Sequence, residues 1–270
     1  MAPYLMYHEL ERHRRALCND SPGYIRYVVR EEDFLRQLDH LRERGTAGLN
    51  VSTALMTPSP GVAITFDDGC ETDLLIAAPA LRERDFSATF YITTGFLGRR
   101  GYLDSQQLRT LAESGFEIGS HGVTHRFLPD LPDEALLTEL SDSKHRLEDI
   151  IGRPVAHLSC PGGRWDERVV RGASNAGYVT VATSRTGLNS TQPDRFQLAR
   201  NAILRHTSLH AFEQICDGSR TGMHQARTRA LDFAKIVLGN RAYVQLRSAA
   251  LLGAKWTEVA LRRFHGATRG

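Results

Sequence analysis

The sequence predicts an α/β protein with a mostly parallel sheet and helices between its strands. Short apolar runs rich in β-branched residues alternate with amphipathic helical stretches, which is the pattern of consecutive βα units. The chain has 270 residues, 41% apolar and 24% charged, and this average globular composition excludes a disordered chain. Such a length fits one barrel-type domain, or a domain of about 200 residues with an appendage.

Seven apolar runs are expected to form the strands. The clearest is a β-branched run at residues 62–66, which has turn residues on both sides. The predicted strands are a first one that ends at His8, followed by residues 62–66, 88–92, 116–119, 155–159, 179–182 and 196–204.

Helical spacing of apolar residues follows several of these strands. Residues 74–81 have the helix period. A second helix is expected to begin with Ser105 as its N-cap and to end before Gly115. A long amphipathic helix is expected over residues 133–151, where Gly152 stops it.

The charge distribution divides the chain near Arg220. Of the 34 basic and 31 acidic side chains, residues 220–270 hold ten and two, a local excess of +8. We therefore expect a main domain over residues 1–218 and a basic helical C-terminal extension over residues 219–270. The extension is expected to pack on the barrel, or to contact an anionic membrane surface as a peripheral element. The acidic remainder argues against nucleic acid as a partner.

Location and cysteine use are consistent with a cytoplasmic chain. The sequence has no run of about 18 apolar residues that could span a bilayer, and its first residues lack the pattern of a secretory signal. Its four cysteines are widely spaced without a CxxC motif. They therefore predict neither a zinc ribbon nor a disulfide framework.

Three polar segments each follow a predicted strand, the place where α/β proteins hold their ligands. They are TFDDG at residues 65–69, SHGVTH at residues 120–125 and SCPGGRWD at residues 159–166. In the first segment, the adjacent carboxylates of Asp67 and Asp68 repel each other and need a cation nearby. A simple hairpin turn is the alternative, but helical spacing follows instead of a second alternating strand.

The second segment carries two histidines at HxxxH spacing. His121 and His125 would direct two imidazoles at one ion if the segment turns helically. By itself this spacing is more often incidental. Together with Asp68 it predicts a facial triad with open coordination positions, which is typical of a catalytic metal site. Non-haem iron oxygenases also use such a triad, but the sequence lacks their HxD pair near these residues.

The TFDDG, HxxxH and Pro-containing motifs resemble those of the polysaccharide deacetylases, carbohydrate esterase family 4, whose domain is also called the NodB homology domain. The resemblance extends from about Leu5 to Ala182. It implies a distorted (β/α) barrel, often of seven strands, with metal-dependent removal of acetyl groups from sugars. The basic helices would then form a C-terminal extension of this barrel.

The resemblance also implies a role for each matching residue. Asp68, His121 and His125 would hold a divalent metal, Zn²⁺ in the first place and Co²⁺, Ni²⁺ or Mn²⁺ as alternatives. Asp67 would be the general base, because an unligated carboxylate beside the ion can take the proton of the attacking water. The backbone N–H of Gly162 would complete an oxyanion hole.

The chain departs from the family pattern at three positions. Ser159 stands where the family commonly has an arginine that pairs with the base, and Arg164 is the candidate to supply that charge and to bind substrate. Gly162 replaces the usual aromatic residue. Gly122 replaces the usual Ser or Thr, which removes the source of one supporting hydrogen bond.

The general acid has no clear counterpart in the sequence. His8 ends the first predicted strand and should face the same rim, so we expect it to orient substrate or to shuttle a proton. His206 and His210 are weaker candidates, because Thr207 or Ser208 would cap a helix there and leave both histidines in solvent.

These observations predict a cytoplasmic, metal-dependent carbohydrate N-deacetylase that acts on an intracellular glycan or glycoconjugate intermediate. One alternative is a deacylase of another small amide on the same fold. A second is a catalytically inactive sugar-binding relative, which the serine at position 159 favours. The intact Asp67 beside a complete triad favours catalysis, because a binding module needs no spare base.

Overall fold

A computed structural model describes residues 1–56 and 61–219 of the chain. The chain divides into two compact units, of which the first comprises Met1–Cys18 and Tyr27–Arg220. The described part of the second unit is residues 19–26, which include the short helix α1 (Pro22–Ile25). The sheet and all the predicted site residues belong to the first unit.

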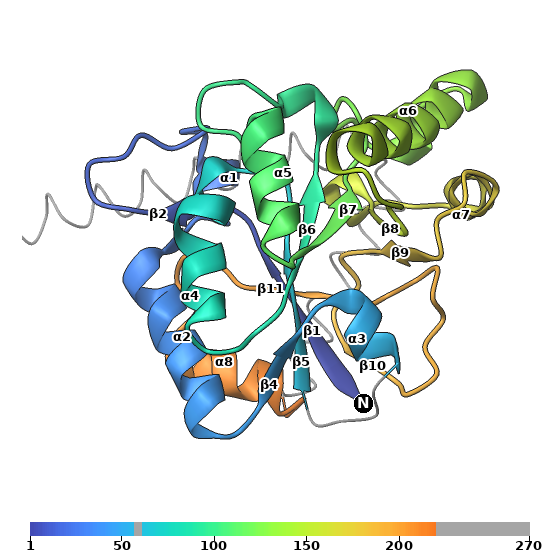
Figure 1. Cartoon of the computed structure of the whole chain (residues 1–270). Helices are drawn as coiled ribbons and strands as arrows, with labels where there is room; N and C mark the ends of the chain where they lie inside the picture. The colour runs from blue at the N-terminus through green and yellow to red at the C-terminus, as the bar shows by residue number, and fades with distance from the viewer. Residues whose placement is uncertain (57–60, 220–270) are drawn as a thin grey trace, which may run out of the picture. The chain divides into compact units, whose positions relative to one another are not determined.

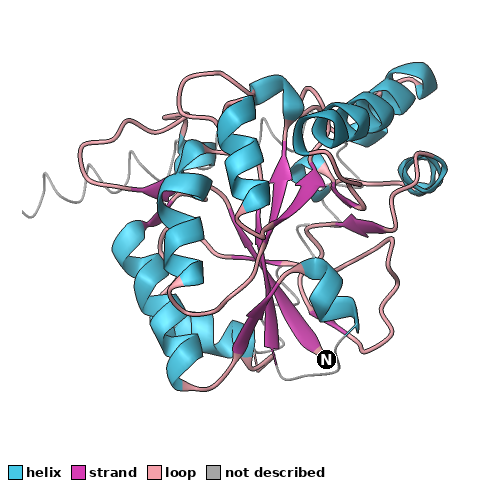
Figure 2. Ribbon diagram, in the orientation of Figure 1, coloured by secondary structure: helices cyan, strands magenta, loops and turns pink. Residues whose placement is uncertain are grey.

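The strands of the first unit are short (Figure 2). Most of their residues are buried. They are β1 (Ala2–Tyr7), β2 (Leu10–Glu11), β3 (Val29–Arg30), β4 (Ala47–Leu49), β5 (Gly61–Phe66), β6 (Thr89–Ile92), β7 (Glu117–Ser120), β8 (His157–Ser159), β9 (Thr180–Ala182), β10 (Leu188–Asn189) and β11 (Asn201–Ala202).

Most helices of the first unit lie between these strands in sequence, and α8 follows the last strand (Figure 1). They are α2 (Glu31–Glu43), α3 (Val51–Met56), α4 (Ala78–Arg82), α5 (Ser105–Glu113), α6 (Asp133–Ile151), α7 (Glu167–Asn175) and α8 (Leu209–Cys216). One turn of π-helix at Asp73–Ala77 leads directly into α4.

The central sheet has the order β1-β5-β6-β7-β8-β9, and every neighbouring pair in this run is parallel. At the edge, β10 pairs with β1 in the antiparallel direction. The segment 195–202 bridges β9 and β1, because Leu198 pairs with Ala182 while β11 pairs with β1. This arrangement confirms the predicted α/β barrel, with an irregular closure between its first and last parallel strands.

The alternation of side chains along β5 separates two apolar layers. Phe66 faces the helices and stacks between Tyr7 and Phe90, at ring centroid distances of 5.2 and 5.0 Å. Ala63 belongs instead to a second cluster with Tyr91 inside the barrel. Because successive residues of a strand face opposite sides, the residue after Phe66 is directed into the barrel interior.

Several predicted boundaries differ from those in the structure. The predicted strand 196–204 is reduced to β11, because its first half bonds to β9 and its second half to β1. The N-cap of α5 is Asp104, not Ser105, and it forms a capping box with Gln107. The helix expected at residues 74–81 begins earlier, at Glu71, and includes the π-helical turn at Asp73–Ala77. Helix α6 is confirmed with its predicted bounds.

The predicted basic extension at residues 219–270 lies outside the described residues beyond Ser219. Its packing and its membrane contact therefore stay predictions. Within residues 1–56 and 61–219, none of the helices combines the length and the apolar character that a bilayer span requires.

Candidate metal and catalytic site

The candidate site residues lie where neighbouring parallel strands end. Asp67 and Asp68 follow β5, His121 follows β7, and Ser159 is the last residue of β8. The register of β1 against β5 places His8 level with Asp67. The carboxyl ends of parallel strands meet at one edge of a sheet, so segments far apart in sequence are brought together here.

Asp68, His121 and His125 form a compact group of three ligand atoms. Oδ1 of Asp68 lies 3.1 Å from Nε2 of His125 and 3.6 Å from Nε2 of His121. All three ligand atoms lie within 4.8 Å of one another. Oδ1 of Asp68 is buried and accepts no hydrogen bond from the described residues, an unfavourable state for a carboxylate unless a cation is bound. Two imidazoles and this oxygen therefore fit a divalent cation.

The electrostatics of Asp68 and His121 suit the same task. His125 differs, because burial is outweighed by the charge of Asp68, which raises the pKa of His125 above its ordinary value, so an ion has to displace a proton from this imidazole. Burial alone would raise the pKa of Asp68, but the charge of His125 outweighs it and holds that pKa well below its ordinary value. Burial lowers the pKa of His121 to about 4, so its imidazole is neutral near pH 7. Nδ1 of His121 lies 2.8 Å from the carbonyl oxygen of Ser159, and donation to this oxygen leaves the lone pair of Nε2 for an ion.

The histidines converge through an irregular loop, which corrects the expected helical turn. Residues 121–125 lie outside any helix. The chain reverses through left-handed backbone at Gly122, with φ 75°, and at His125, with φ 60°. The imidazole rings lie 5.1 Å apart. The two imidazoles of the HxxxH motif thus come together because the loop reverses direction, and not because residues i and i+4 share one face of a helix.

Glu139 of α6 holds this loop in place. Its buried carboxylate accepts hydrogen bonds from the backbone N–H of Val123, at 2.6 Å, and of Thr124, at 3.0 Å. The hydroxyl of Thr124 donates to the same carboxylate. These hydrogen bonds take the place of the supporting bond that a Ser or Thr at position 122 would make. Their acceptor, Glu139, belongs to α6 and lies outside the HxxxH motif.

We expect Glu139→Gln to weaken metal binding by about 10–100-fold, because one oxygen becomes a donor that faces backbone donors and loosens the His125 loop. The measurement is a competition titration of metal-free protein with a chelating dye and Zn²⁺. Glu134→Gln, on the exposed start of the same helix, is the matched control. An affinity equal to that of the control would contradict this role of Glu139.

Asp67 is held by a buried arginine that sequence reasoning missed. Nη1 and Nη2 of Arg200 donate to Oδ1 and Oδ2 of Asp67 at 2.7 and 2.8 Å. Nη2 also donates to the hydroxyl of Ser159 at 2.7 Å, and this hydroxyl lies 3.3 Å from Oδ2. Burial opposes ionisation of Asp67, but the charge of Arg200 lowers its pKa below the ordinary value. Asp67 is therefore a carboxylate whose orientation is fixed.

Arg164 does not supply the charge beside the base, which corrects that expectation. Its guanidinium lies over the ring of Phe127, at 4.4 Å from the centroid. Arg200 makes the expected pair because β11 and the preceding turn direct it into the barrel, where Ser159 leaves space for its guanidinium. The only signal in the sequence was that Arg200 is a single cation within the predicted strand 196–204. An arginine in such a strand ordinarily faces solvent, so this signal did not indicate a buried ion pair.

Phe127 also explains the glycine at position 162. Gly162 has φ 62°, and a Cβ atom there would lie 2.6 Å from Cε1 of Phe127. The aromatic ring that the family commonly has in this loop would thus overlap a ring from the loop of His125. The backbone N–H of Gly162 stays a predicted oxyanion donor.

The three remaining histidine candidates separate into one buried near the site and two that are exposed. His8 is buried at Nδ1, and its ring lies 4.8 Å from that of Tyr27. Burial lowers the pKa of His8, although Asp68 and Asp67 oppose this shift. His206 is exposed, and His210 lies on the exposed first turn of α8, which Ser208 caps as expected. His8 stays the predicted substrate or proton residue.

Asp73 is a buried acid near the site, and it makes the free energy of unfolding depend on pH. Neither of its oxygens accepts a hydrogen bond from the described residues. Burial and then the charge of Asp68 raise the pKa of Asp73 well above its ordinary value. Above about pH 4 the folded state keeps a proton that the unfolded chain loses, so this residue lowers stability as pH rises toward its folded pKa.

For metal-free protein we expect Asp73→Asn to remove a slope of up to about 1.4 kcal/mol per pH unit from the free energy of unfolding. Urea unfolding of the wild type and the variant at about pH 5 and about pH 7 measures this slope. The variant should gain stability over the wild type as pH rises. Parallel pH dependence of the two proteins would refute the expectation.

Comparison with known proteins agrees with this geometry. Residues 55–181 match the polysaccharide deacetylase family. YxkH of Bacillus subtilis, which is named as a polysaccharide deacetylase, is 27% identical over 217 residues, or 78% of this chain and 74% of YxkH. A peptidoglycan-N-acetylglucosamine deacetylase of Bacillus cereus is 34% identical over 124 residues, or 46% of this chain and 56% of that enzyme.

Solved structures show the same fold. The Streptococcus pyogenes deacetylase PplD, solved in complex with acetate, superposes with a TM-score of 0.70 and is 23% identical. The match covers 80% of this chain and 97% of PplD. The distorted (β/α) barrel of the NodB type, implied by the motif resemblance, is thus confirmed for the described barrel.

Proposed function

This chain belongs to the polysaccharide deacetylase family, and we propose from that premise that it hydrolyses the N-acetyl group of an amino-sugar substrate in a metal-dependent reaction. One observation carries the proposal. The two adjacent carboxylates have different partners, because Asp68 faces His121 and His125 while Asp67 is paired with Arg200. This division gives one carboxylate to an ion and keeps the other as a base.

Asp68, His121 and His125 would hold the divalent ion, with Zn²⁺ as the first candidate and Co²⁺, Ni²⁺ or Mn²⁺ as alternatives. Such an ion supplies Lewis-acid polarisation of the acetyl carbonyl and lowers the pKa of a water molecule beside it. The neutral imidazole of His121 and the ionised carboxylate of Asp68 are the protonation states that this ligand role requires.

Asp67 takes a proton from the attacking water as general base. Its Oδ2 lies 3.9 Å from Nε2 of His121, so it borders the ligand group without belonging to it. Arg200 keeps Asp67 ionised and fixes both of its oxygens by a bidentate pair. Oδ2 accepts from Arg200 and from the hydroxyl of Ser159, so Oδ1 keeps the lone pair that can accept the proton.

Addition of water to the acetyl carbonyl and cleavage of the C–N bond give acetate and an amine, and the amine nitrogen gains a proton as it leaves. We assign the backbone N–H of Gly162 to the carbonyl oxygen and Arg164 to the sugar. His8 is assigned to orienting the substrate or delivering the proton, because it directly follows β1 and lies level with Asp67. The name of the Bacillus cereus relative supports an N-acetylglucosamine unit in the substrate.

The test is acetate release from a chitooligosaccharide by the zinc-loaded protein, followed by proton NMR. We expect acetate from the wild type and none above background from Asp67→Asn. Release of a different acid from other acylated amides would identify another deacylase. Tight sugar binding without any released acid would identify a sugar-binding protein and overturn the proposal.

A further inference from the structure

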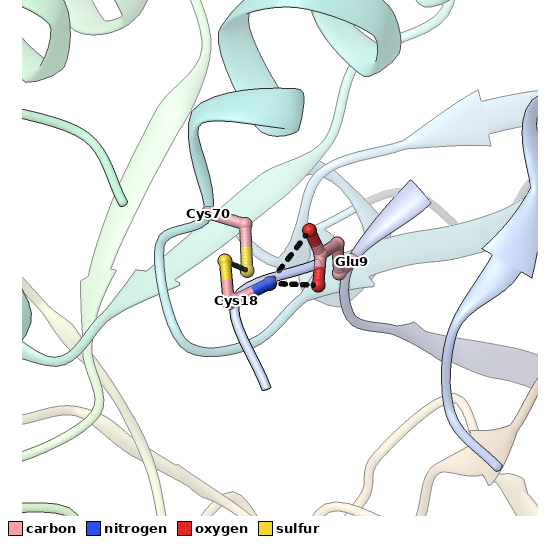
Figure 3. A group of neighbouring side chains, drawn as sticks. All are labelled: Glu9, Cys18 and Cys70. Atoms are coloured by element: carbon pink, nitrogen blue, oxygen red, sulfur yellow. Dashed lines mark hydrogen bonds between the residues drawn. The ribbon is translucent and has the colours of Figure 1, made fainter. Parts of the chain in front are cut away.

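A second group of reactive side chains lies next to the catalytic loop, and the proposed reaction does not use it. Glu9, Cys18 and Cys70 come together from three segments of the first unit (Figure 3). The two sulfur atoms lie 3.6 Å apart, although 52 positions separate them in sequence. Cys70 is fully buried and Cys18 is partly exposed. Cys70 directly follows the Asp67-Asp68-Gly69 turn.

The surroundings of these thiols do not favour a metal ion. The Glu9 carboxylate is completely buried and lies 2.5 Å from the guanidinium of Arg15. Both of its oxygens also accept from the backbone N–H of Cys18, at 3.0 and 3.2 Å. Its charge is thus neutralised and three hydrogen bonds already occupy its oxygens, and a second cation beside Arg15 would be repelled. Only two sulfur ligands would remain.

We infer that Cys18 and Cys70 form a disulfide bond when the protein meets a low-molecular-weight disulfide. The sulfurs are already in contact and need to approach by about 1.5 Å to reach the length of an S–S bond. This inference is independent of the proposed deacetylase reaction.

The exposure of the two thiols sets the order of the reaction. The thiolate of Cys18 attacks one sulfur of the small disulfide and forms a mixed disulfide, which releases one small thiol. The sulfur of Cys70 then attacks the Cys18 sulfur and displaces the second small thiol. The two protons of the protein thiols end on the two small thiols, and two electrons pass from the protein to the small disulfide.

The backbone around the pair favours the second step. Cys70 is held by a β-bridge to Tyr102, and the Sγ of Cys18 donates to the carbonyl oxygen of Gly101 at 3.0 Å. Both sulfurs are therefore fixed relative to the same short segment. Arg15 adds a further tie, since it donates to that carbonyl at 3.2 Å and pairs with Glu71 at 2.7 Å. The bond would join the segment that contains Arg15 and Cys18 to the loop that carries Asp67 and Asp68.

The experiment treats the full chain with oxidised glutathione in the presence of a chelator, and then applies mass spectrometry and peptide mapping. We expect a loss of two hydrogens and a Cys18–Cys70 cross-linked peptide in the wild type. Cys70→Ser should instead trap glutathione on Cys18, and Cys18→Ser should leave Cys70 unmodified. Cys216→Ser removes a second partly exposed thiol and should cross-link like the wild type.

A second measurement follows the melting temperature. Because the bond closes a long loop, oxidation should raise the melting temperature by about 5–10 °C in the wild type and in Cys216→Ser. The melting temperatures of Cys18→Ser and Cys70→Ser should not rise. Glutathione that stays on Cys18 of the wild type without a cross-link would overturn the inference. Zinc retained by the chain after His121→Asn and lost only with Cys18→Ser would overturn it in favour of a metal site.

Discussion

Replacing Asp67 by asparagine is expected to lower kcat/KM for acetate release by about 10²–10⁴-fold while the protein still binds one metal ion. The amide cannot accept a proton from water, but it keeps the shape of the side chain and one acceptor for Arg200. The measurement is steady-state acetate release by the zinc-loaded variant. A melting curve shows that the assayed protein is folded.

Asp142→Asn is the matched control for this change, because Asp142 is exposed on α6 and does not belong to the ligand group. It should keep the activity of the wild type. If Asp67→Asn loses less than about tenfold, another group takes the proton and the assignment of the base is wrong.

Replacing Arg200 by methionine should lower the free energy of unfolding by about 3–5 kcal/mol. The loss arises because the buried carboxylate of Asp67 keeps its charge without its partner. Urea unfolding measures it. Arg185→Met, an exposed arginine bonded to Gln197, is the control and should change stability by less than about 0.5 kcal/mol.

The double variant Asp67→Asn with Arg200→Met separates charge pairing from packing. It removes both buried charges, so its stability should exceed that of Arg200→Met alone, although its activity should stay lost. Additive losses in the double variant would show that the two side chains do not act as a pair. Arg200→Lys should keep part of the stability but not the bidentate geometry.

The sequence predicted the barrel and the ligand group because both depend on local patterns. The apolar runs at β5 and β7 were clear, and the polar segments after them ended at one edge of the sheet as expected. The strands alternate with helices of ordinary length, so periodicity identified the fold class. Short elements such as β2 and β3 lacked a sufficient pattern and were not predicted.

The interactions that hold the site could not be predicted, because they come from residues distant in sequence. Arg200 reaches Asp67 across 133 positions, through a closure in which adjacent short segments pair with different strands. Glu139 supports the histidine loop from the middle of a helix, where an isolated glutamate is normally exposed. Such pairings depend on tertiary packing, and no motif spacing encodes them.

The contact between two of the cysteines could not be predicted from the sequence either. Their wide spacing predicted no disulfide framework, and the structure describes all four as thiols. Contact between Cys18 and Cys70 arises only because the segment after β2 folds back over the turn that follows β5. Spacing alone cannot show that two residues meet in space.

The most direct test of the site is the metal content of four proteins, each stripped with a chelator, loaded with Zn²⁺, dialysed and analysed by mass spectrometry for zinc. We predict about one zinc per chain in the wild type and in Asp67→Asn, and less than about a tenth of that in Asp68→Asn and His125→Asn. Full zinc content in either of the last two proteins, or an equal loss in Asp67→Asn, would contradict the division of labour between the two aspartates.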